Sequence, residues 1–398
     1  MSQDRYDDVP YDRELIRSGG IPATKANTPS NAHPQPTARP APRPTQARRT
    51  RSASPARRRR RGFWGTLKLL FLLALIAAVI GAVLLGFRAA SFNDAVSTAP
   101  FPSTALLGSL NGDERVNVLL IGYGGPDHDG PYLADSIQIL SIDPETDTTT
   151  TIPIPRDLWI EGVGPYPENG KINEVFAAGH AQGGLEGGAE LMAAVLSDVT
   201  GLDIQHWLSI DFAGFRDMID AVGGVTINNP VAFSYTNNGA SHQAGDWSLG
   251  SFPAGEIHLD GNQALAYSRA RFTSVVAEST DFARSIRQAR VLSALRTELG
   301  SGGFGSVLPG LKMMDAMEGR VLTDLSVIDL FLLSSHLNSD RRIDVSDGTI
   351  LTATTNTIGQ YILIPVDWTG PGAYDGFRTF LADELARPIE EPAATDAP

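Results

Sequence analysis

The stretch VNVLLIGYGG, residues 116–125, opens the folded part of this chain and sets its class. Residues 116–121 form a short apolar run that glycines follow, which is typical of a buried strand. Two more strands are predicted at 136–142 and 148–154. Helical and extended patterns then alternate, which indicates α/β layers around one sheet. We expect helices at 173–180, 187–200, 212–221, 260–267 and 281–299, and strands at 206–210 and 225–227.

Charge is spread unevenly over the 398 residues, which include 32 Lys and Arg against 45 Asp and Glu. Residues 1–61 carry a net charge of about +9, whereas residues 89–398 carry about −24. The first segment is rich in Pro, Ala, Arg and Ser and is expected to be disordered. The chain has no cysteine, so disulfides stabilise none of it.

Between these segments lies LLFLLALIAAVIGAVLLGF, residues 69–87, which carries no charge. Its length suits one helix across a bilayer, and its distance from the start of the chain favours an anchor over a cleaved signal peptide. Arginines 57–61 precede it, so we expect a cytoplasmic N-terminus and an external C-terminal domain. The predicted organisation is a disordered basic cytoplasmic tail (1–61), a transmembrane anchor (62–88), a stalk (89–112), an extracytoplasmic catalytic domain (113–385) and a disordered C-terminus (386–398).

Basic side chains gather in AYSRARF and DFARSIRQAR, residues 266–272 and 281–290, although the domain is acidic. Arg269 and Arg271 alternate, so in extended chain they point the same way. Asp281, Arg284 and Gln288 share one helix face, and Arg287 lies beside it. Guanidinium groups near a helix start suit a phosphate or pyrophosphate, although a solvated helix face would give the same spacing.

Two other motifs add polar groups. IPIPRDLWIEG places Arg156 and Asp157 after a strand, where α/β domains bind ligands, and GKINEVF places Lys171 and Asn173 at a helix start. The turn after residue 121 offers oxygen and imidazole ligands for Mg²⁺, although such turns are often only turns. These candidate ligands are Asp127, His128, Asp129 and Asp135. The sequence contains no Walker A, Gly-x-Ser-x-Gly or HExxH motif.

Seven motifs in order resemble the LytR–CpsA–Psr family of envelope proteins, over about residues 115–300. They are VNVLLIGYGG, LADSIQILSIDP, IPRDLWIEG, KINEVFAAG, DFAGFRDMIDAVGGVTI, LDGNQALAYSRARF and DFARSIRQARVL. The resemblance implies an α/β fold with a central mixed sheet flanked by helices and an apolar groove for a lipid. It also implies a phosphotransferase that moves an anionic glycopolymer from a polyprenyl-pyrophosphate carrier to peptidoglycan, beside the lipid bilayer and without nucleic acid.

The family pattern also assigns roles to residues of this chain. Asp135 is expected to hold Mg²⁺ or Mn²⁺. Arg156, Arg269 and Arg271 are expected to hold the phosphates, with Lys171, Asn173, Arg284, Arg287 and Gln288 beside them. Asp157 would orient Arg156, and Asp281 would orient the arginines or act as a base.

Two departures from the family pattern concern the metal and the phosphate clamp. Gly124 stands where the family has an aspartate, and Leu133 stands where it has an arginine. His128, Asp127 or Asp129 are candidates to replace the missing ligand. Two alternative functions remain open: a hydrolase that splits the lipid pyrophosphate without transfer, and a non-catalytic envelope regulator of the transcription-attenuator type.

Overall fold

The computed structural model describes residues 61–236, 249–271, 273–299, 307–335, 339–345 and 348–389, and from Leu67 onward the chain forms one compact unit. The tail predicted at 1–61 lies outside the described residues except for its last residue. Most of the C-terminal end predicted at 386–398 also lies outside them. Both expectations therefore stay predictions.

A mixed sheet forms the centre of this unit, as expected. Its strands lie in the order β11-β6-β1-β2-β3-β12. Their bounds are β1 Val116–Tyr123, β2 Ala134–Asp143, β3 Thr148–Pro153, β6 His206–Asp211, β11 Val321–Thr323 and β12 Ser339–Arg342. β1 runs parallel to β6 and β12 runs parallel to β3, whereas the other neighbours are antiparallel.

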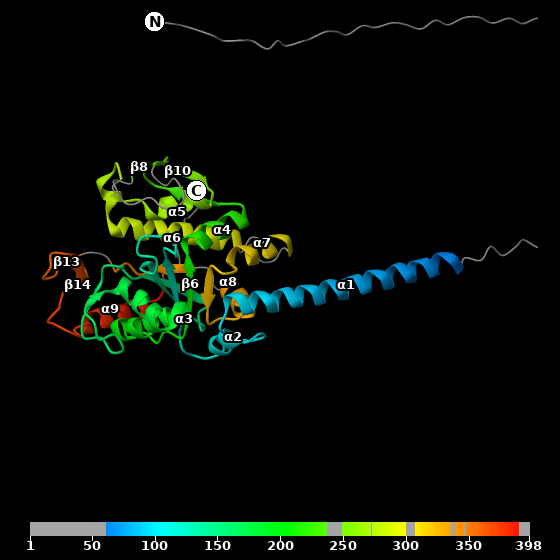
Figure 1. Ribbon diagram of the computed structural model, residues 1–398, viewed down its shortest axis with the longest axis horizontal. Helices are drawn as coiled ribbons and strands as arrows, with labels where there is room; N and C mark the ends of the chain where they lie inside the picture. Colours follow the sequence, from blue (N-terminus) through cyan, green and yellow to red (C-terminus); the bar gives the residue numbers. More distant parts are fainter. Residues whose placement is uncertain are drawn as a thin grey trace, which may run out of the picture. The chain divides into compact units, whose positions relative to one another are not determined.

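Helices and short strand pairs surround this sheet (Figure 1). The helices are α1 Arg61–Val96, α2 Ala105–Leu110, α3 Ile172–Thr200, α4 Phe212–Val222, α5 Gly261–Arg269, α6 Asp281–Glu298, α7 Val307–Met317, α8 Val327–Ser335 and α9 Asp375–Ala386, with a 3₁₀ turn at Val276–Ser279. The antiparallel pairs are β4 Trp159–Ile160 with β5 Gly170–Lys171, β7 Val225–Asn229 with β10 Gly255–Leu259, β8 Phe233–Thr236 with β9 Leu249–Phe252, and β13 Leu351–Thr355 with β14 Tyr361–Pro365.

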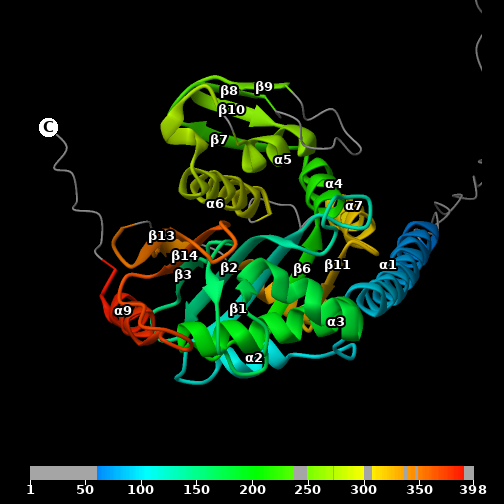
Figure 2. The same cartoon turned by 60° about the vertical axis from the view of Figure 1, so that its left-hand side comes forward.

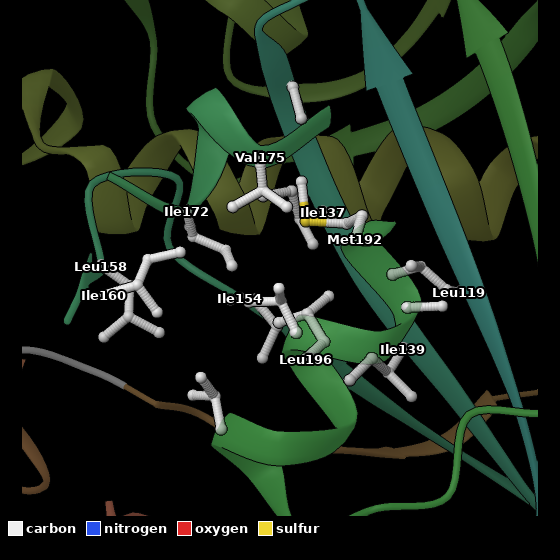
Figure 3. Close-up of a cluster of buried hydrophobic side chains, with 14 of the residues drawn as sticks. Leu119, Ile137, Ile139, Ile154, Leu158, Ile160, Ile172, Val175, Met192 and Leu196 are labelled. Atoms are coloured by element: carbon white, nitrogen blue, oxygen red, sulfur yellow. The ribbon is translucent and has the colours of Figure 1, made fainter. Parts of the chain in front are cut away.

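The apolar run of β1 is buried on both faces, which explains why it does not alternate with polar residues. Leu119 and Ile121 belong to a cluster that α3 and α9 cover. Figure 3 shows Leu119 and Ile139 of the sheet among the buried side chains of this cluster, together with Met192 and Leu196 of α3. Val118 points to the other face, where it packs in a cluster with residues of α7 and α8. Each such buried side chain stabilises the fold by about 1.5–3 kcal/mol.

A glycine pair breaks α3, so the two helices predicted at 173–180 and 187–200 are confirmed. Gly183 and Gly184 have non-helical backbone angles inside α3, and Gly184 has a φ of +66°. That left-handed conformation favours glycine. The start of α6 also follows the prediction, because the side chain of Thr280 accepts a hydrogen bond from the backbone N–H of Ala283.

α1 contains Phe71–Val96, a helix long and apolar enough to cross a membrane. The stalk expected at 89–112, however, packs against the domain. Phe92 and Val96 of α1 and Leu106 of α2 are buried in the cluster that contains Val118. Because these apolar side chains belong to the core beside the sheet, residues 89–112 form part of the folded domain.

Candidate functional site

An ion pair between Asp135 and Arg156 lies at the centre of the site. Asp135 stands at the start of β2, beside the irregular pairing at Gly122 and Tyr123 of β1. Arg156 Nη1 lies 2.5 Å from Asp135 Oδ1. The Arg156 side chain is positioned by a turn after β3, which the backbone N–H of Leu158 closes by donating to the carbonyl of Pro155 at 3.0 Å.

A second carboxylate, Asp157, links this turn to α3. Asp157 Oδ1 lies 2.5 Å from Lys171 Nζ, and Asp157 Oδ2 lies 3.5 Å from Arg156 Nε. The backbone N–H of Asn173 donates to the carbonyl of Arg156 at 3.3 Å. Asn173 is buried, and its side-chain Oδ1 has no hydrogen-bond partner among the described residues. A buried amide oxygen of this kind is usually satisfied by water or a ligand.

Arg269 joins the cluster from the opposite side. Its Nη2 lies 4.0 Å from Asp135 Oδ2 and donates to His128 Nε2 at 2.8 Å. Its guanidinium also stacks over the ring of Phe212, 4.2 Å from the ring centre. Arg269 is the last residue of α5, so the extended conformation expected for it is wrong. The helix predicted at 260–267 starts at the capping box of Asp260 and Gln263 as expected, but it continues two residues further, to Arg269.

His128 occupies the space next to Gly124, where the family pattern would have an aspartate. A Cβ atom on Gly124 would lie 2.7 Å from the His128 ring, so glycine lets the imidazole lie there. Burial and the positive charge of Arg269 lower the pKa of His128. Because Arg269 donates to Nε2, the imidazole is neutral and accepts a hydrogen bond at that atom.

The remaining predicted cations surround this cluster. Arg284 of α6 is buried. Burial opposes ionisation of Asp135, but the charges of Arg156, Arg269 and Arg284 outweigh it and lower the Asp135 pKa below its ordinary value. The charge of half-buried Arg271 also acts on Arg269, which places it nearby. The cluster therefore brings several cations close to the carboxylate of Asp135.

Arg287 has a different environment from the other predicted phosphate ligands. It is fully buried and pairs with Glu278 at 2.7 Å. It also donates to the backbone carbonyls of Tyr267, Ala270 and Glu278. We therefore assign Arg287 to support of the loop after α5 and not to ligand binding. The side chain of Asp281 lies outside the described residues, so its role stays a prediction.

An apolar cavity opens beside this cluster, between the sheet and α4 to α8. Arg269 and Gln288 line it together with Phe212, Leu208 and Leu292, and its empty volume is about 1260 Å³, including its open mouth. Sequence reasoning gave Phe212 and the leucines no role. The sequence did contain a signal for the cavity. Gln288, Leu292, Leu295 and Leu299 are spaced by three or four positions, so they share one face of α6, which is polar at Gln288 and apolar after it.

Among the predicted metal ligands, Asp135 is the one whose position suits a divalent metal ion. Asp127 and Asp129 are exposed on the turn after β1, and the described residues contain no group of three or more His, Asp or Glu side chains placed to hold a metal ion. Mg²⁺ often takes only one or two carboxylates and completes its shell with water and substrate phosphates. Asp135 fits a metal of that kind, one shared with a phosphorylated substrate.

A family model matches this chain over residues 89–366, with the description LytR_cpsA_psr family. The chain belongs to this family. All seven sequence motifs quoted above and the arginine cluster fall within the matched range. The match also includes residues 89–112, in agreement with their packing against the domain.

Two curated relatives carry the name polyisoprenyl-teichoic acid–peptidoglycan teichoic acid transferase TagU. The protein of Oceanobacillus iheyensis is 32% identical over 251 residues, 63% of this chain and 72% of the relative. That of Bacillus mycoides is 30% identical over 222 residues, 56% of this chain and 64% of the relative, so the chain matches just under two thirds of the latter.

The fold also occurs in solved structures. Protein gbs0355 from Streptococcus agalactiae has a TM-score of 0.54 at 21% identity and covers 73% of this chain and 93% of its own. A transcriptional regulator, EF0465, from Enterococcus faecalis has a TM-score of 0.50 at 24% identity and covers 71% and 91%. At these identities the likeness supports the α/β fold alone.

Proposed function

We propose that this protein transfers an anionic glycopolymer from a polyprenyl-pyrophosphate carrier to peptidoglycan and forms a phosphodiester bond. The observation that carries the proposal is the position of Arg269. It contacts the charged cluster through Asp135 and also lines the apolar cavity. A diphosphate with an apolar chain is the kind of ligand that needs both environments at adjacent positions. The names of the curated relatives agree with this substrate class.

Arg156, Arg269 and Arg284 bind the diphosphate, because guanidinium groups match phosphate oxygens in charge and geometry. The hydroxyl oxygen of the acceptor attacks the phosphorus that carries the glycopolymer. The bond between that phosphorus and the bridging oxygen breaks, and polyprenyl phosphate leaves with the bonding electrons. The arginines stabilise the charge that develops on this leaving group.

The proton of the acceptor hydroxyl needs a base, and we assign this role to Asp281. Asp135 is a poor base, because its lowered pKa makes its carboxylate a weak proton acceptor. Asp135 instead would hold Mg²⁺ or Mn²⁺, which when bound would neutralise phosphate charge. Asp157 holds Lys171 and Arg156 in place. Positioning supplies most of the rate in a reaction of this type.

We further propose that α1 anchors the protein in the cell membrane as a single span, with the N-terminus in the cytoplasm and the catalytic domain outside. The basic run at 57–61 supports this orientation. An anchored domain stays beside a carrier that cannot leave the bilayer.

The test uses full-length protein in vesicles with a polyprenyl-pyrophosphate-linked polymer and peptidoglycan. Arg269→Ala should reduce formation of the covalent polymer–peptidoglycan product about a hundredfold or more. Arg387→Ala, at a largely exposed arginine, is the matched control and should retain activity. Release of polyprenyl phosphate without the covalent product would favour the hydrolase. Wild-type transfer by Arg269→Ala would contradict the proposed site.

A further inference from the structure

A second pocket lies beside the apolar cavity, between α6 and the strands β2, β3 and β12. Its empty volume is about 680 Å³, including its mouth. Arg290 and Arg296 of α6 and Arg341 and Arg342 of β12 line it. We call it the Arg296 pocket. Asp135, Arg156 and Arg269 do not line it, so it is separate from the charged cluster described above.

Arg296 is the residue that marks this pocket as a binding site. Its side chain is buried, with the residue only 8% exposed, and its Nε and Nη2 have no hydrogen-bond partner within the described part of the chain. Burial lowers the pKa of Arg296 to about 10, so the group stays charged near neutral pH. A buried charge without a partner is costly, and a bound anion would remove that cost.

The other side chains of the pocket add positive charge and unused donors. Arg342 donates from Nε to Asp344 at 2.9 Å, but its Nη1 and Nη2 have no partner among the described residues. Arg290 donates to the hydroxyl of Tyr267 at 3.1 Å, a neutral group. Glu384 also acts on Arg341 electrostatically. Among the described residues, four arginines and no carboxylate line the pocket.

We infer that the Arg296 pocket binds a phosphate group. A carboxylate offers only two oxygens, whereas a phosphate offers at least three and up to two negative charges, which suits guanidinium groups on several sides. Gln138, Leu292 and Arg296 line both this pocket and the apolar cavity. The phosphate is therefore either free or the head group of a lipid whose chain enters the cavity. Neither role is required by the transfer reaction proposed above.

Binding is measured by isothermal titration calorimetry on full-length protein in a neutral detergent, with inorganic phosphate and with dodecyl phosphate. The measurements are made in the Arg269→Ala background, which weakens binding at the charged cluster. Arg296→Met should weaken binding of the preferred probe about tenfold or more, because charge-assisted hydrogen bonds are lost. Lys312→Met removes an exposed cation of α7 that lines neither pocket and should leave binding unchanged.

The two probes separate the sources. Equal affinity for both indicates free phosphate, and tighter binding of dodecyl phosphate indicates a lipid head group. Arg342→Gln serves as a second variant, with circular dichroism as the test of folding. The inference is wrong if neither probe binds in the Arg269→Ala background, or if both folded variants bind the probes like their parent. Loss of transfer in Arg269→Ala tests the proposed function independently.

Discussion

The clearest consequence of the structure concerns Arg287, whose guanidinium is held by the protein itself. It forms four hydrogen bonds of 2.5–2.9 Å, to the carbonyls of Tyr267, Ala270 and Glu278 and to the carboxylate of Glu278. Arg287→Met keeps an unbranched apolar side chain and removes all of these donors. The carboxylate of Glu278, whose side chain is 15% exposed, then loses its partner.

Breaking a buried ion pair from one side costs about 3–5 kcal/mol, because the remaining charge is left uncompensated. For a folded unit of this size the unfolding entropy is roughly 0.7 kcal/mol/K, so the Tm should fall by about 4–7 °C. The lost bonds also release the loop after α5, which carries Arg271. We therefore expect lower stability first, and lower activity only as a consequence.

The assay is thermal unfolding of full-length protein in a neutral detergent, followed by circular dichroism. Arg296→Met, on the same helix, is the matched comparison. The buried Nε and Nη2 of Arg296 have no partner in the described part of the chain, so its removal should leave the Tm unchanged or raise it. Arg287→Met with an unchanged Tm and reduced phosphate affinity would refute this reasoning and return Arg287 to the ligands.

The remaining predictions concern pH and the cavity. Burial opposes ionisation of Asp157, but Lys171 and Arg156 outweigh this effect and lower the pKa of Asp157 in the folded protein. The ionised carboxylate therefore stabilises the fold above its unfolded pKa of about 3.9. This contribution is lost as the pH falls through the lower pKa of the folded state. Urea midpoints at pH 6 and pH 3 should therefore differ less in Asp157→Asn than in wild type. The exposed Asp383→Asn should follow wild type, and equal differences in both variants would contradict the argument. Leu208→Trp fills part of the apolar cavity and should weaken binding of a long-chain prenyl phosphate but not of a short-chain one. Equal affinities of the variant and the wild type for the long-chain ligand would contradict a role of the cavity in binding the chain.

Most of the sheet could be predicted because its strands are buried on both faces and end at clear turn residues. The run that forms β1 contains few polar residues and is followed by glycines, and β6 ends at Asp211, which caps the next helix. The kink in α3 was also readable, since Gly183 and Gly184 interrupt an otherwise helical stretch. Local signals sufficed where local conformation decided the outcome.

Long-range packing decided the features that the sequence did not predict. Nothing in residues 89–112 indicates that Phe92 and Leu106 pack against β1, so the segment resembled a stalk. Phe212 lies about 57 positions before Arg269, and the stacking between them depends on how α4 and α5 pack together. The cavity likewise exists only once the sheet and several helices are assembled.

The arginines of the chain show why residue type and spacing could not distinguish arginines that bind a ligand from arginines that stabilise the fold. A buried guanidinium needs negative charge, and the source of that charge differs at each position. Arg287 has its own carboxylate and needs no ligand. Around Asp135 and Asp157, by contrast, Arg156, Arg269, Arg284 and Lys171 act together on two described carboxylates. That concentration of cations suits a diphosphate, and because it depends on which side chains meet in space, it becomes visible only in the fold.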